Sequence, residues 1–144
     1  MPELIMKGVL GGLLLSGAIQ DVFIKKINTW IVVTGAILTC VCLPFCHSVS
    51  LSDRAFGAFI GGGVMLLSKA TGGKIGMGDG FLLCVTGIGL GFWGNMELFA
   101  LSLFAASIVS VILLVFRLAD RKKSIPFIPF LLLGYVVFIF TSWK

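Results

Sequence analysis

Six apolar stretches dominate the 144-residue chain, and the short segments between them hold most of its charged residues. The stretches lie at about residues 4–19, 30–45, 55–67, 81–93, 98–116 and 128–140. Because 58% of the residues are hydrophobic and only 12% are charged, lipid is the expected solvent. A helix needs roughly 20 apolar residues to cross a membrane. The sequence therefore predicts an all-α, polytopic membrane protein with about six transmembrane helices in a single domain, residues 1–144.

Glycine is the second feature that bears on the fold, with 19 residues in the chain. The third and fourth stretches are short for a full crossing, so the glycine-rich flanks at 61–63 and 72–78 must extend or break them. Small residues let helices in a membrane approach one another closely. We interpret most of the glycines as packing positions.

The cations are distributed unevenly between alternate loops. Eight fall on one side (Lys25, Lys26, Lys69, Lys74, Arg117, Arg121, Lys122 and Lys123) and three on the other (Lys7, Arg54 and Lys144). Because cytoplasmic loops are rich in Lys and Arg, the N-terminus is predicted outside. The net charge of +5 is then a topology signal and indicates no nucleic-acid partner. An alternative makes residues 4–18 a cleaved signal peptide, but that reading reverses the charge distribution.

Two aspartates interrupt this apolar pattern. Asp21 follows the first stretch, and Asp79 lies in the run Gly76-Met77-Gly78-Asp79-Gly80, which has the GxGD pattern of intramembrane aspartic proteases. Ionisable residues at the edge of a membrane indicate function by default. Two helices lie between the two acids, so both are predicted at the cytoplasmic side.

Ionisation of two carboxyl groups in one poorly solvated site has a high cost in free energy, so the pair is expected to share a proton. The ionised member then activates water, and the protonated member donates to the peptide carbonyl. No metal or other cofactor is required. Gly76 and Gly78 lack a Cβ, which permits unusual backbone angles and a close substrate backbone, so a bulky residue at Gly78 is expected to damage activity.

Simpler interpretations remain open for each acid. Asp79 suits the N-terminus of a helix as a cap. Asp21 opposes the dipole at the C-terminus of its helix, but a lone charge at the interface is unremarkable. Glu3, Asp53 and Glu97 fall in predicted outer loops. The cysteines near His47 lack the spacing of a zinc site.

Three segments resemble motifs of the aspartic type IV prepilin peptidases. Residues 21–27 (DVFIKKI) resemble the first-aspartate segment, in which basic residues, here Lys25 and Lys26, follow the acid. Residues 73–83 (GKIGMGDGFLL) are similar to the segment in which GxGD opens a helix. Residues 125–130 (IPFIPF), which include Pro126 and Pro129, resemble the start of the last helix. The three motifs occur in the family's order.

The resemblance implies cleavage of the short leader of a type IV prepilin or pseudopilin at the cytoplasmic face of a bacterial or archaeal membrane. Asp21 and Asp79 would be catalytic, with Gly76, Gly78, Lys25, Lys26, Pro126 and Pro129 supporting the motifs or the substrate. The basic loops would serve topology, with positioning of anionic lipid head groups or of an acidic pilin residue as the alternative. The resemblance does not include a methylating region, so N-methylation is not expected.

The chain also departs from the family pattern. Asn28-Thr29 stands where the family has Pro-Asn, so the turn into the second helix is expected to be built differently, and Gly80-Phe81 is unusual after the second aspartate. Two other classes of function stay open. A small transporter or channel also needs acids beside a glycine-broken helix, and a non-catalytic assembly partner would need neither acid.

Overall fold

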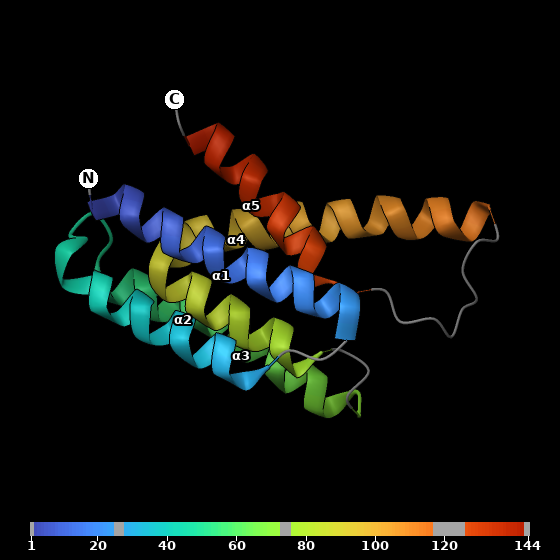
Figure 1. Ribbon diagram of the computed structural model, residues 1–144, viewed down its shortest axis with the longest axis horizontal. Helices are drawn as coiled ribbons and strands as arrows, with labels where there is room; N and C mark the ends of the chain where they lie inside the picture. Colours follow the sequence, from blue (N-terminus) through green and yellow to red (C-terminus); the bar gives the residue numbers. More distant parts are fainter. Residues whose placement is uncertain (1, 25–27, 73–75, 117–125, 143–144) are drawn as a thin grey trace.

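The computed structural model of the protein describes residues 2–24, 28–72, 76–116 and 126–142. These residues form helices and connecting turns with no strand, which confirms the all-α prediction (Figure 1). The elements are α1 (Pro2–Ile24), α2 (Thr29–Cys42), the 3-10 turn η1 (Leu43–Phe45), α3 (Leu51–Ala70), α4 (Met77–Val115) and α5 (Ile128–Ser142).

Helix α4 is a helical hairpin. Gly91 has φ 77° and ψ −176°, a conformation that only glycine adopts without strain. The Asn95 amide donates to the Leu83 carbonyl oxygen at 3.0 Å, although twelve residues of continuous helix would separate these positions by about 18 Å. The chain therefore reverses, and we call residues 77–90 the first arm of α4 and residues 92–115 its second arm. The sequence placed this break a few residues later, between 93 and 98.

Consecutive helical segments run in alternating directions. Figure 1 shows the end of α1, the start of α2, the end of α3 and the start of α4 at one end of the bundle. The start of α5 joins them there, because the Ile128 backbone N–H donates to the Asp21 carboxylate. We call this the aspartate end. The hairpin turn at Gly91 lies at the opposite end, and the far part of the second arm of α4 projects beyond the bundle (Figure 1).

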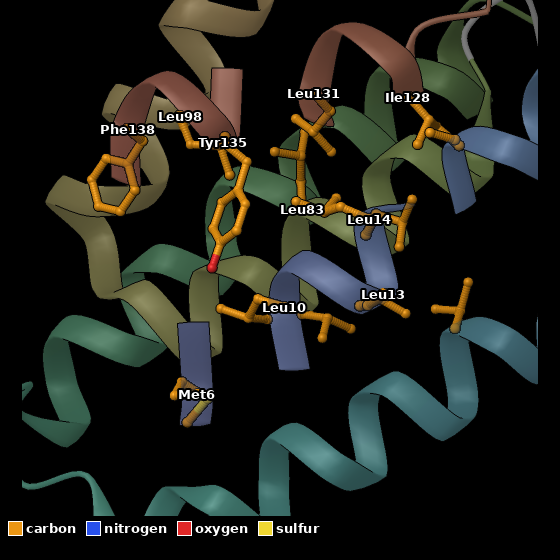
Figure 2. Packing of buried hydrophobic residues seen from close by; sticks show 14 of the residues in the cluster. Met6, Leu10, Leu13, Leu14, Leu83, Leu98, Ile128, Leu131, Tyr135 and Phe138 are labelled. Carbon is orange, nitrogen blue, oxygen red and sulfur yellow. The ribbon is translucent and has the colours of Figure 1, made fainter. Parts of the chain in front are cut away.

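Helix α1 contributes several buried residues to the core. Leu10 and Leu14 are fully buried, and the Tyr135 hydroxyl of α5 donates to the Lys7 carbonyl oxygen at 2.6 Å. In Figure 2 the Tyr135 side chain points from α5 to α1, with its hydroxyl beside Leu10. Helix α1 thus packs against α5 in the core of the bundle.

Glycines bring α3 and the first arm of α4 into backbone contact. A Cβ added to Gly57 would lie 2.5 Å from the carbonyl oxygen of Gly87, and one added to Gly80 would lie 3.0 Å from the backbone nitrogen of Met65. Gly61 is similarly packed against Cys84 and Gly80. The interpretation of glycines as packing positions is confirmed for these residues. Such close approach replaces the hydrophobic driving force that lipid cannot supply.

Arg54 is buried at the end opposite the aspartates, although the sequence suggested a loop cation. Its guanidinium donates to the carbonyl oxygens of Cys46 at 2.6 Å, Val49 at 3.2 Å and Ile88 at 2.8 Å. Ile88 is in the last turn before the break at Gly91, where carbonyls lack intrahelical donors. Arg54 thus ties the α2–α3 connection to the hairpin of α4.

We expect Arg54→Met to lower the free energy of unfolding by about 3 kcal/mol, because three carbonyl groups lose a charged donor. Thermal or SDS unfolding in detergent measures this change. Lys69→Met, which removes an exposed cation from the last turn of the same helix, is the matched control and should shift stability by less than about 0.5 kcal/mol. Equal stability of the two variants would contradict the role of Arg54 in holding the α2–α3 connection against the hairpin of α4.

Two helices in the described ranges have the length and hydropathy of a membrane span, Glu3–Ile24 and Met77–Val115. Because α4 reverses at Gly91, its second arm, residues 92–115, is the continuous part that reaches the required length, about 36 Å. Large apolar side chains are exposed on every long helix, for example Phe23, Phe59 and Phe104. Such a surface suits association with lipid. The number of helices that cross remains a prediction.

Candidate active site

Asp21 lies in the last turn of α1 and is half-buried. Its Oδ2 accepts a hydrogen bond from the backbone N–H of Ile128, the first residue of α5, at 3.3 Å. The dipole of its own helix disfavours an anion at this position, but the N-terminus of α5 favours one. The long-range contact with α5 therefore accounts for an acid at the C-terminal end of α1.

Asp79 lies in the first turn of α4 and is also half-buried. Gly76 is the N-cap of this helix, and the Asp79 backbone N–H donates to the Gly76 carbonyl oxygen at 3.2 Å. The Asp79 carboxyl group folds back over Gly76, since an added Cβ there would lie 3.0 Å from Oδ2. Within the described part of the chain no side chain caps this helix, so the interpretation of Asp79 as its cap is not supported.

The helices that carry the two acids contact each other one turn away from Asp21 and Asp79, and this packing brings the acids together. A Cβ on Gly17 of α1 would lie 3.4 Å from Cδ1 of Leu82 in α4 and 3.5 Å from Cγ2 of Ile128 in α5. Asp21 is four residues after Gly17, and Asp79 is three residues before Leu82, so each acid lies on the same helix face as its contact residue. Asp79 is accordingly close enough to Asp21 for the two carboxyl groups to interact electrostatically. Two half-buried carboxyl groups thus occupy one end of the bundle.

The other residues singled out in the sequence have different outcomes. Lys25 and Lys26 lie outside the described residues. Pro129 is the second residue of α5, where its missing N–H is harmless, and the half-buried Pro126 precedes the helix. Gly78 is half-buried in the first turn of α4.

The expectation of unusual backbone angles beside Asp79 is wrong. Gly76 has φ −62° and ψ 122°, which any residue adopts, and Gly78 is helical. Among the described glycines, positive φ occurs at Gly72 and Gly91. What glycine provides at position 76 is the space that the Asp79 carboxyl group occupies.

The turn into α2 is built on Asn28, the residue that stands in place of the family's proline. The Asn28 side chain accepts from the Trp30 backbone N–H at 3.2 Å, which makes it the N-cap of α2. Its own N–H donates to Gln20 Oε1 at 3.1 Å. Gln20, the neighbour of Asp21, thereby joins the end of α1 to the start of α2. The sequence alone missed Gln20, although the N-cap pattern Asn28-Thr29 was visible.

The opposite end of the bundle holds a pocket of about 170 Å³ whose lining includes Lys7, Arg54 and Phe138. It lies away from both aspartates. Glu3, Asp53 and Glu97, expected in outer loops, lie instead within α1, α3 and the second arm of α4. No set of three or more His, Cys, Asp or Glu residues is placed to hold a metal ion within the ranges described above. At the aspartate end, the described residues include two carboxyl groups, each of which can give or take a proton.

Comparison with known proteins gives one match. Residues 8–115 match the model of the type IV leader peptidase family, a region that contains Asp21, Asp79 and the hairpin of α4. No curated protein and no solved structure matches the chain. Since the matched region covers well over half of the 144 residues, the chain belongs to the type IV leader peptidase family.

Proposed function

We propose that this protein is a membrane aspartic endopeptidase that removes the short leader from type IV prepilins or pseudopilins, with Asp21 and Asp79 as its catalytic pair. The family supplies the class, a leader peptidase. The observation that carries the assignment of the site is the convergence of the two carboxyl groups, from the end of α1 and the start of α4, within electrostatic reach of each other.

The mechanism needs one proton shared between the two acids. The ionised carboxylate removes a proton from water as the water oxygen attacks the scissile carbonyl carbon, and the protonated acid donates to the carbonyl oxygen. The tetrahedral intermediate then collapses, the C–N bond breaks, and the leaving amine takes a proton from the carboxyl pair. The original protonation state is restored after product release.

A membrane placement follows from the alternating segments. We infer one domain over residues 1–144, six crossings by α1, α2, α3, the two arms of α4 and α5, and an outside N-terminus. This places the aspartate end at the cytoplasmic face of the cell membrane, where a prepilin leader is exposed. Lys69 in the last turn of α3 belongs to this end and, with the other basic loop residues, would meet anionic lipid.

The remaining motif residues would act around the pair. Lys25 and Lys26 follow Asp21 by four and five positions in the sequence and are proposed to support substrate binding. Pro126 and Pro129 fix the start of α5, whose first N–H contacts Asp21.

Co-expression with a panel of tagged prepilins tests the proposal. Leader removal is followed as a mobility shift and located by mass spectrometry of the new N-terminus. Cleavage of at least one prepilin at the leader junction is expected with wild-type protein. Absence of cleavage across the panel, together with an ion or solute flux that depends on Asp79, would contradict it and favour a transporter.

We expect Gly76→Val to reduce cleavage by about tenfold or more, because the new side chain crowds the Asp79 carboxyl group and shifts it from its position. Cleavage kinetics and thermal unfolding are measured together. Gly63→Val is the control, since a Cβ at Gly63 meets no atom within 4 Å. Retention of full activity in Gly76→Val would show that the space at position 76 is not needed for catalysis.

A further inference from the structure

Helix α5 contacts one of the two acids of the candidate site. Three segments meet there: the last turn of α1, the first turn of α4 and the N-terminus of α5. Asp21 accepts the Ile128 backbone N–H at 3.3 Å. Among the described residues, no donor to the Asp79 carboxyl group is found within hydrogen-bonding distance. The two acids therefore differ in their partners.

We propose that the N-terminus of α5 is a positioning element for the reaction, in which the Ile128 backbone N–H holds the Asp21 carboxylate in place. This inference rests on the proposed function. The sequence did not distinguish the general base from the general acid, and this inference does. Asp21 is the carboxylate that activates water, and Asp79 is the acid that donates a proton to the carbonyl oxygen.

Two physical arguments support this assignment. A hydrogen bond from an N–H to a carboxylate is roughly twice as strong as one between neutral groups, so the donor stabilises the anion selectively. The N-terminal end of a helix adds a favourable dipole. Asp79 also lies near a helix N-terminus, but as the third helical residue after the Gly76 N-cap, its carboxyl group accepts no described N–H.

The backbone of α5 is fixed well enough to serve this purpose. Ile128 is fully buried, and its side chain packs against Gly17, one turn below Asp21. The Phe130 and Leu131 N–H groups donate to the Phe127 carbonyl oxygen at 2.9 Å and 3.1 Å and close the first turn. Pro129, which lies within this turn, restricts its backbone. Residues 126–130 thus direct the Ile128 N–H group toward Asp21.

A simple structural role competes with this proposal. Asp21 then only caps α5, and loss of the bond weakens the bundle without a specific effect on turnover. A single-atom change separates the two roles, because replacing the Ile128 amide by an ester removes the N–H and keeps the side chain. The matched control is the same replacement at Phe130, whose N–H donates to the Phe127 carbonyl oxygen and not to Asp21.

The experiment uses full-length protein made by cell-free translation into nanodiscs, with the α-hydroxy acid analogue of isoleucine at 128 or of phenylalanine at 130. Leader cleavage of a prepilin processed by the wild-type protein gives kcat and KM. We expect the ester at 128 to lower kcat about tenfold or more, with KM within about twofold of wild type. The ester at 130 should leave both constants within about twofold.

Equal kcat values for the two esters would overturn the proposal, as would a loss of thermal stability at 128 large enough to account for the lost activity. These outcomes presuppose a wild-type protein that cleaves, so they differ from failure of the proposed function, in which the wild type and the Phe130 ester are inactive as well.

Discussion

Replacement of Asp79 by asparagine is expected to abolish leader removal, with a fall in kcat of at least about 10²–10⁴-fold, the usual contribution of a general acid or base. Asparagine keeps the shape of the side chain but can neither give nor take the proton that the reaction needs. Asp21→Asn should have a loss of the same order, because the pair acts as a unit and effects within such a unit are not additive. The double variant should therefore be no less active than either single variant.

The measurement is kcat/KM for a purified prepilin in detergent or nanodiscs, with circular dichroism and thermal unfolding to verify the fold. Glu97→Gln is the matched control, because Glu97 is an exposed acid in the second arm of α4 and should retain cleavage within about twofold. Cleavage that survives either Asp21→Asn or Asp79→Asn would exclude a two-aspartate mechanism.

The second large effect concerns stability. Gly57→Val is expected to destabilise the bundle by about 3 kcal/mol or more, above the usual range for overpacking. A Cβ at this position would lie 2.5 Å from the Gly87 carbonyl oxygen and 2.7 Å from the Gly91 carbonyl carbon. Backbone atoms cannot rotate away as a side chain does, so α3 and the first arm of α4 must separate. Asp79, which begins that arm, should then lose its position.

Gly62→Val provides the control on the same helix. A Cβ at Gly62 meets no atom within 4 Å, so valine there should change stability by less than about 1 kcal/mol. Unfolding by SDS or heat and the yield of monodisperse protein measure both variants. If Gly57→Val were as stable as Gly62→Val, the close approach of α3 and α4 would not be a main source of stability.

Together these variants separate chemistry from architecture. The aspartate variants should lose cleavage with the fold intact, whereas Gly57→Val should lose both in proportion. Arg54→Met should likewise lose stability and cleavage in proportion, because it acts at the end of the bundle opposite the aspartates.

The apolar pattern alone was sufficient to predict the helical class and most of the helical segments. Residues 4–19, 30–45 and 128–140 correspond to α1, α2 with η1, and α5. The break between the fourth and fifth stretches was expected from Trp93 onward, whereas the chain reverses at Gly91. Three nearby glycines, Gly89, Gly91 and Gly94, have the same local sequence signal, and only the contacts of Asn95 and Arg54 select one of them.

The sequence predicted the two acids of the candidate site but not how they are arranged in space. Charge alternation placed Asp21 and Asp79 at one end, and the motif resemblance agreed with the family match. The hydrogen bond from Ile128 to Asp21 joins residues 107 positions apart, and no local pattern specifies such a contact. The burial of Arg54 was missed for the same reason, because its three acceptors are backbone carbonyl groups brought together by the fold.

By itself the sequence determined a helical protein with two acids at helix ends, and it predicted a surface exposed to lipid, since hydropathy and charge act locally along the chain. The tertiary structure decided which acid has a backbone donor and which glycines are indispensable. It also selected the glycine at which the hairpin of α4 turns. Each of these depends on the approach of helices within a few ångströms, and such distances arise from the packing of residues far apart in the chain.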